Sequence, residues 1–282
     1  MANVKIVTDS LADLPPALMQ GLDITIVPCL VQVGGKTYRD KLDLDTEGFY
    51  RLIANIPKPP TTSNPPVGMF EEVYRQLART TRQIVSIHVA STLSGTFNSA
   101  RLAAQNVRQD TPVMIEVVDS QQLSMAQGWL VIHAARAAAR GATLTEILEL
   151  VESLRERPRL IAMLDSLQYA QRSGRLGKAA GMVGTMLNVK PLLALSRGEV
   201  LPLGAARTQQ QALERLVEIA LEYGLNQEMA VVHCYAEVLA RRLKYMVMSH
   251  IPNGQVTIAE TGPVSGTHVG PGVVGLAWLA PK

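Results

Sequence analysis

The chain has 282 residues and contains few of the features that mark secreted or membrane proteins. Its only two cysteines, Cys29 and Cys234, form no motif and do not suggest a disulfide framework. Its apolar runs are shorter than the roughly 18 residues that span a bilayer. The residues that follow Met1 show no signal-peptide pattern. These absences predict a cytoplasmic protein without a membrane span.

Aromatic residues make up only 4% of the chain, and no basic stretch is interleaved with them. Nucleic acid is therefore not an expected partner. The net charge is +3, but between Arg155 and Arg207 nine Lys and Arg stand against three Asp and Glu. Such a segment is either a solvated basic face or a docking surface for an acidic partner or a phosphorylated ligand.

Several enzyme signatures are also missing. The sequence has no G-x-S-x-G elbow, no P-loop and no G-x-G-x-x-G after a predicted strand. No spacing of His, Cys and Asp fits a zinc site. Ser94 and His268 could in principle act as nucleophile and base, but no carboxylate can be assigned to orient the histidine. We therefore rank catalysis below binding and expect no metal or cofactor.

The sequence does contain short β-branched runs that alternate with longer helical patterns. The predicted strands are Lys5–Thr8, Ile24–Val33, Ile84–Val89, Met114–Val118, Leu160–Leu164, Met229–Cys234 and Val256–Glu260, and the clearest helices are Thr46–Ile56, Gly68–Thr80, Phe97–Val107, Gln122–Arg140 and Leu144–Arg157. This alternation predicts an α/β fold with largely parallel strands. The pair Arg157-Pro158 ends a helix before a new strand, so we expect domains at 1–158 and 159–282.

Two hydroxyl-rich loops precede predicted helices. Ser91-Thr92-Leu93-Ser94-Gly95-Thr96 joins a strand to a helix, where the free N–H groups of the first turn favour an anion. Pro60-Thr61-Thr62-Ser63-Asn64-Pro65-Pro66 is a rigid loop with several hydrogen-bond donors. Each loop taken alone is also explained as a helix cap with a turn.

Two further segments could hold an anion. Gln171–Gly177 places Arg172 and Arg175 beside glycines, which suits an anion clamp, a partner contact or an ordinary basic turn. Thr261–Gly272 surrounds His268 with glycine and proline, which indicates a fixed loop that approaches a ligand closely. A lone histidine is nevertheless more often structural.

These motifs together resemble the DegV family of fatty-acid-binding proteins. The resemblance covers essentially the whole chain and is carried by Val7-Thr8-Asp9-Ser10, Thr62-Ser63-Asn64-Pro65, Ser94-Gly95-Thr96, Val117-Val118-Asp119-Ser120, Arg172-Ser173-Gly174-Arg175 and His268-Val269-Gly270-Pro271-Gly272. It implies two α/β domains with the ligand site between them. The N-terminal domain would have a mainly parallel sheet, and the C-terminal one would be a smaller α/β sandwich.

The resemblance also implies a ligand and a role. A long-chain, palmitate-like fatty acid would be held at its carboxylate by the hydroxyl loops and the histidine, at Thr62, Ser63, Ser94, Gly95, Thr96 and His268. The protein would not be catalytic alone but would present the acid to an ATP-binding kinase subunit that forms an acyl phosphate. Candidates for facing the kinase are Arg172, Arg175 and Arg207. The stretch Met182–Leu195 could line the acyl tunnel or be ordinary core.

Two positions depart from the family pattern. Pro66 stands where the family often has serine, which removes one hydroxyl from the first loop. Ser173 stands where a second glycine is common, and it would be strained if the position needs a positive φ. Two other functions stay open on the sequence alone: an acyl hydrolase or transferase that uses Ser94 and His268, and a sensor of a small phosphorylated metabolite.

Overall fold

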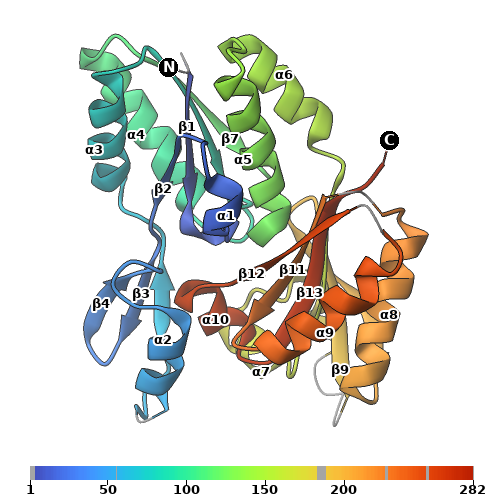
Figure 1. The fold of residues 1–282 in the computed structure, drawn as a ribbon. Helices are drawn as coiled ribbons and strands as arrows, with labels where there is room; N and C mark the ends of the chain where they lie inside the picture. Colours follow the sequence, from blue (N-terminus) through green and yellow to red (C-terminus); the bar gives the residue numbers. More distant parts are fainter. Residues whose placement is uncertain (1–3, 55, 183–188, 226–227, 252–253, 282) are drawn as a thin grey trace.

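The computed structural model describes residues 4–54, 56–182, 189–225, 228–251 and 254–281 (Figure 1). The strands are β1 (Val4–Asp9), β2 (Ile24–Val27), β3 (Leu30–Val33), β4 (Lys36–Arg39), β5 (Thr61–Ser63), β6 (Gln83–His88), β7 (Met114–Asp119), β8 (Pro158–Met163), β9 (Lys190–Ser196), β10 (Glu199–Ala206), β11 (Glu228–Cys234), β12 (Gln255–Glu260) and β13 (Val273–Leu279). The α-helices are α1 (Pro16–Met19), α2 (Thr46–Ile53), α3 (Val67–Ala78), α4 (Thr96–Asp110), α5 (Ser124–Ala139), α6 (Leu144–Leu154), α7 (Gln168–Ser173), α8 (Gln209–Glu222), α9 (Glu237–Met248) and α10 (Pro263–Val269), with 3-10 turns η1 (Ser10–Ala12) and η2 (Gly177–Met182).

The first sheet is parallel throughout, in the order β2-β1-β6-β7. Alternate side chains of β1 face opposite ways, as the pleat of a strand requires. Ile6 packs beneath α5 and α6, whereas Val7 packs beneath α3 and α4. Helices therefore cover both faces, as parallel sheets need.

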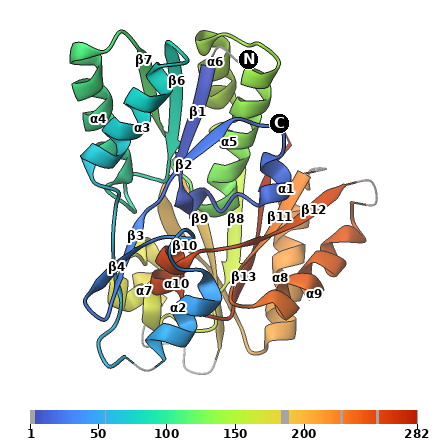
Figure 2. The same cartoon turned by 60° about the vertical axis from the view of Figure 1, so that its left-hand side comes forward.

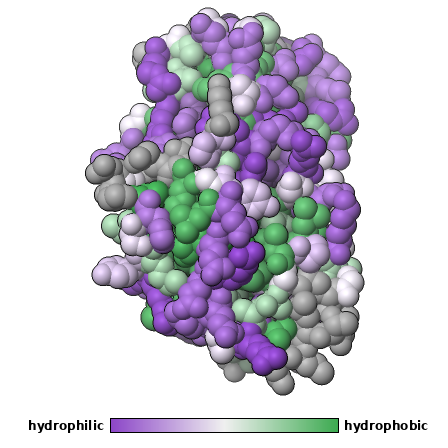
Figure 3. Space-filling model, turned by 90° about the vertical axis from the view of Figure 1, so that its right-hand side faces the viewer, coloured by the Kyte–Doolittle hydropathy of each residue, from purple (hydrophilic) through white to green (hydrophobic). Residues whose placement is uncertain are grey.

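The second large sheet has six strands in the order β10-β9-β8-β13-β11-β12. Only β11 and β12 pair in parallel, and every other pairing is antiparallel. The expectation of largely parallel strands is therefore confirmed for the first sheet and wrong for this one. Helices α8 and α9 cover one face. On their side of the molecule, hydrophobic areas flank a hydrophilic band (Figure 3), and Val238, Tyr245 and Met248 of α9 are exposed.

A small antiparallel sheet, β4-β3-β5, lies beside the two large ones. The predicted strand Ile24–Val33 is wrong as a continuous element, because it divides into β2 and β3 at Pro28-Cys29. Proline has no N–H to donate to a strand ladder. The chain leaves the parallel sheet there, and β3 then pairs with β5, which carries Thr62 to the site described below.

Helix α5 packs against strands of both large sheets (Figures 1 and 2). It contacts β1 on one side and β8 and β13 on the other, and the Trp129 indole donates to the Ala277 carbonyl at 3.0 Å. One buried cluster thus contains residues from both sides of Pro158, among them Ile6 and Leu160. Within the described ranges, no helix is both long enough and apolar enough to cross a bilayer.

Candidate ligand-binding site

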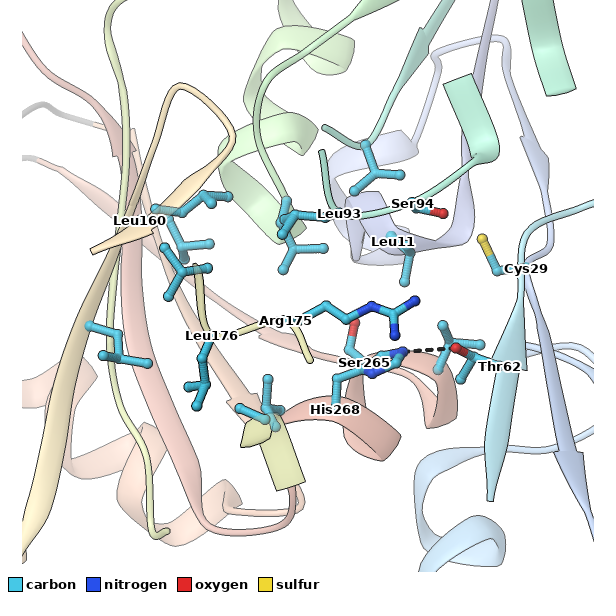
Figure 4. A pocket seen from close by; sticks show the side chains of 18 of the residues that line it. Leu11, Cys29, Thr62, Leu93, Ser94, Leu160, Arg175, Leu176, Ser265 and His268 are labelled. Atoms are coloured by element: carbon cyan, nitrogen blue, oxygen red, sulfur yellow. Dashed lines mark hydrogen bonds between the residues drawn. The ribbon is translucent and has the colours of Figure 1, made fainter. Parts of the chain in front are cut away.

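A cavity of about 220 Å³ lies between the loops that end the first sheet and the face of the second sheet (Figure 4). It is lined by Leu11, Cys29, Thr62, Ser63, Asn64, Val89, Leu93, Ser94, Gly95, Leu123, Leu160, Ala162, Leu164, Ala170, Arg175, Leu176, Leu193, Ala194, Leu195, Val200, Val264, Ser265, His268 and Val269. Polar side chains gather at one end, and Leu160 lies at the other. We call these the head end and the tail end.

Strands β8 and β9 supply much of the apolar wall. Leu160 and Ala162 of β8, with Leu164 just beyond it, occupy alternate positions and line the cavity, whereas Ile161 and Met163 pack toward α8 and α9. Leu193 and Leu195 of β9 also line it. In the predicted tunnel stretch Met182–Leu195, residues 183–188 lie outside the described residues.

The head end is built around a bond between β5 and α10. The Thr62 hydroxyl and His268 Nε2 lie 2.8 Å apart. Burial, together with the positive charge of Arg175, lowers the pKa of His268 to about 4, so the imidazole is neutral at neutral pH. Among the described residues, His268 Nδ1 and the Ser265 hydroxyl are buried without a hydrogen-bond partner. Such groups can serve a polar ligand.

The Ser91–Thr96 loop forms the wall facing α10. Ser94 and Gly95 line the cavity, and the Ser94 hydroxyl lies 2.8 Å from that of Thr96. Thr96 is fully buried behind Ser94 and does not line the cavity. Gly95 is the N-cap of α4, and the Thr96 N–H of the first turn donates to the Ser94 hydroxyl at 3.3 Å. Ser63 lines the cavity from β5 and is otherwise exposed.

The structure separates the three arginines that the sequence grouped together. Arg175 lines the cavity, and its guanidinium reaches the head end (Figure 4). Within the described chain it forms no ion pair with a carboxylate. Arg172 is exposed on α7, over the Tyr169 ring at 5.8 Å. Arg207 is exposed just after β10, seven residues beyond the cavity residue Val200 in the sequence, and lines no part of the cavity.

Ser173 does not have a positive φ, so the condition for strain at this position is not met. Ser173 is the last residue of α7, and its hydroxyl donates to the Ala170 carbonyl. The left-handed position is the next residue, Gly174, with φ 72°. Pro66 directly precedes α3 and does not line the cavity, so a serine there would stand at the helix cap.

A second, open groove adjoins the head end. Its volume is about 640 Å³, and it shares Leu93, Ser94, Gly95, Arg175 and Val200 with the cavity. Lys178 and Glu199 form an ion pair of 2.6 Å along it. The side chain of Arg175 therefore borders both spaces.

The arrangement does not favour a nucleophile at the head end. The Ser94 hydroxyl bonds to Thr96, while His268 Nε2 bonds to Thr62. Burial raises the pKa of the Cys29 thiol well above its usual value. No group of three His, Cys, Asp or Glu among the described residues could hold a metal ion.

A serine–histidine–aspartate chain does exist away from the cavity. His88 Nδ1 lies 2.9 Å from Asp9 Oδ2, and His88 Nε2 lies 2.7 Å from the Ser86 hydroxyl. All three residues are 0% exposed, and the serine also bonds to the Tyr74 hydroxyl at 2.8 Å. A substrate cannot reach this serine, so the chain is part of the core.

Sequence reasoning did not single out Asn64 or Ser265. The Asn64 amide donates to the Ser99 hydroxyl at 2.7 Å and so joins the β5–α3 connection to α4. Ser265 lies three residues before His268 on α10, a spacing that places both on one helix face. That spacing was visible in the sequence, but the helix was not predicted there.

Comparisons with known proteins identify the family of this chain. A family model described as "Uncharacterised protein, DegV family" matches residues 3–281. Protein DegV of Bacillus subtilis is 32% identical over 280 residues, which cover 98% of this chain and 99% of the relative.

Two solved structures are similar in fold. One, described as showing the fatty acid binding of a DegV family protein from Thermus thermophilus, has a TM-score of 0.91 and 30% identity and covers 99% of this chain and 100% of its own. The other, a stearic acid-binding protein from Eubacterium ventriosum, has a TM-score of 0.88 and 27% identity and covers 98% of each chain. The chain described here belongs to the DegV family.

Proposed function

We propose that this protein binds a long-chain, palmitate-like fatty acid in the cavity, with the carboxylate at the head end. The observation that carries the proposal is the head end itself. Three polar groups converge there, at one end of an otherwise apolar cavity: a neutral histidine, and an arginine and a buried hydroxyl that have no carboxylate or hydrogen-bond partner, respectively, in the part of the chain that the structure describes. This polarity matches a molecule with one anionic group and an unbranched hydrocarbon tail.

Each part of the ligand finds a suitable environment. Arg175 supplies the positive charge, and charge-assisted hydrogen bonds of this kind are stronger than neutral ones. Further hydrogen-bond donors come from Thr62, Ser63, Ser94 and His268. Gly95 lets α4 begin beside the head group, and the Thr96 hydroxyl orients Ser94. The tail gains about 0.8 kcal/mol for each CH₂ that the leucine-lined wall removes from water.

The similar structures support the ligand class, because they are described as proteins that bind fatty acids, stearic acid among them. We further propose that the protein is a cytoplasmic carrier without catalytic activity of its own. It would present the acid to an ATP-dependent kinase subunit, with the exposed Arg172 and Arg207 facing that partner. The groove beside Arg175 offers a polar route to the carboxylate.

Native mass spectrometry of the protein purified from cells tests the ligand class. We expect a bound species with the mass of a long-chain fatty acid. After the lipid is removed, added palmitate should bind again in a 1:1 complex. Protein that carries no lipid and takes up neither palmitate nor oleate would contradict the proposal.

Calorimetric titration with palmitate and hexadecanol tests the role of Arg175. Because the alcohol has no charge, Arg175→Gln should weaken palmitate binding by about tenfold or more and leave hexadecanol binding nearly unchanged. Arg172→Gln is the matched control, since this exposed arginine lies outside the cavity, and it should bind both ligands as the parent does. Equal losses for both ligands in Arg175→Gln would show that the guanidinium does not contact the carboxylate.

A further inference from the structure

Helix α10 carries two head-end residues, Ser265 and His268, yet it has only seven residues. So short a helix has little stability of its own, and its position depends on what holds it. Its first turn is held by residues from the N-terminal part of the chain. Asp40, in the connection between β4 and α2, accepts the Val264 N–H of this turn, and Thr46, the first residue of α2, donates to the Thr261 carbonyl just before the helix.

Asp40 is the centre of these contacts. Its side chain is buried, and Oδ1 accepts the Val264 N–H of α10 at 3.0 Å. Oδ2 accepts the Ser10 hydroxyl at 2.7 Å, and the Ser10 oxygen in turn accepts the Cys29 N–H at 3.1 Å. Cys29 and Val264 both line the cavity, whereas Asp40 does not. One carboxylate therefore connects two walls of the cavity from behind.

Neighbouring contacts reinforce this connection. Lys41 lies 2.6 Å from Asp13 Oδ1 and donates to the Glu260 carbonyl at 2.9 Å. Thr46 donates to the Thr261 carbonyl at 2.8 Å. The backbone of Gly262 lies so close to the Asp40 side chain that a Cβ on this glycine would be 2.5 Å from Asp40 Oδ1. We call Ser10, Asp13, Asp40 and Lys41 the Asp40 cluster.

We propose that Asp40 is a positioning residue for carboxylate recognition: it sets α10, and with it Ser265 and His268, against the hydroxyl loops of the first sheet. This inference rests on the proposed function. Both oxygens of Asp40 accept hydrogen bonds, one on each side, so an amide cannot replace the carboxylate without loss. Oδ1 of an asparagine could still accept the Val264 N–H, but Nδ2 would then face Ser10 and could only donate, so the Ser10 O–H would lose its acceptor.

The variant Asp40→Asn tests the inference. Its affinity for palmitate, which has a charged head group, is compared with its affinity for hexadecanol, which has an uncharged one. The leucines of β8 and β9 that form much of the apolar wall are not bonded to Asp40, so hexadecanol affinity should stay within about twofold of the parent. Palmitate affinity should fall by about tenfold, because the hydrogen-bonding groups of α10 move away from the carboxylate. Asp43→Asn is the matched control, since Asp43 pairs with Arg39 at the surface of the same loop. It should retain the parental ratio of the two affinities.

If Asp40 had a purely structural role, its substitution would weaken the binding of palmitate and of hexadecanol equally, and that result would overturn the inference. Should Asp40→Asn fail to fold, Ser10→Ala keeps the Asp40–Val264 bond and removes the hydroxyl that joins Asp40 to Cys29. It should lower the ratio of palmitate affinity to hexadecanol affinity by about threefold, and an unchanged ratio would overturn the inference as well. Failure of the parent protein to bind palmitate is a separate result, and it would contradict the proposed function instead.

Discussion

The role of His268 depends on a partner far away in the chain. Thr62, which meets its Nε2, is 206 residues away. The Gly- and Pro-rich setting of His268 indicated a fixed loop, but no local pattern names such a partner. The same limit applies to the arginines. Arg172, Arg175 and Arg207 look alike in the sequence, and only the turn at Gly174 directs one of them into the cavity.

The lowered pKa of His268 makes stability depend on pH in a defined window. The unfolded chain takes up this proton near pH 6.5 and the folded protein only near pH 4. The unfolded state therefore binds more protons between these values, and stability falls as the pH falls through them. From pH 7 to pH 4.5, the free energy of unfolding of the lipid-free parent should drop by about 2 kcal/mol more than that of His268→Gln. Urea unfolding at the two pH values measures this, and equal drops would show that His268 does not carry the effect.

At the scale of elements, β8 is the clearest case of a pattern that determines a wall. Its alternate residues separate the cavity from the core beneath α8, so a change at one cavity position should alter the ligand space and leave the core beneath α8 in place. Leu160 lies at the tail end, opposite the hydroxyl loops (Figure 4).

Leu160→Phe should therefore shorten the usable cavity. Stearate should lose at least about fourfold more affinity than laurate, because each methylene that no longer fits forfeits about 0.8 kcal/mol. Leu160→Ile, which conserves the volume, is the control and should keep the parental order of affinities. Competition binding with the two acids provides the measurement. A uniform loss across chain lengths would mean that the tail does not reach Leu160.

The sequence predicts the strands whose residues alternate in polarity or are rich in β-branched side chains. The strands that it does not predict have physical explanations. Strand β13 reads Val-Val-Gly-Leu-Ala-Trp-Leu and is buried at every position, so it shows no alternation. The three residues of β5 form a strand only because β3 pairs with them. Strands β9 and β10 form an antiparallel pair at the edge of the sheet, and their aliphatic residues read equally well as core or tunnel.

For the whole molecule, the shared core matters more than the predicted boundary at Pro158. The cluster around α5 joins Ile6 and Val85 of the first sheet to Leu160 and Ala277 of the second. Arg136 of α5 also pairs with Glu228 of β11 at 2.6 Å. The division into domains 1–158 and 159–282 stays a prediction, and these contacts argue that the two parts depend on each other.

The two tryptophans report on this dependence. Trp129 lies in the shared cluster and Trp278 in the core beneath α8 and α9. Trp129→Phe and Trp278→Phe each leave one tryptophan, and each loses one buried indole hydrogen bond. In each variant, the urea midpoint measured by tryptophan fluorescence should equal the midpoint measured by far-UV circular dichroism, because one cooperative transition has a single midpoint. A fluorescence midpoint displaced from the circular dichroism midpoint would show that the two parts unfold separately.

The place of β13 in its sheet also governs how the protein is made. The strand lies between β8 and β11, yet it leaves the ribosome after every other strand of the sheet. Without β13, no ladder would join β8-β9-β10 to β11-β12, and each group would have an unpaired inner edge. Exposed edges of this kind invite pairing with other chains. A chain in which β13 has not yet been inserted would therefore be open to such pairing.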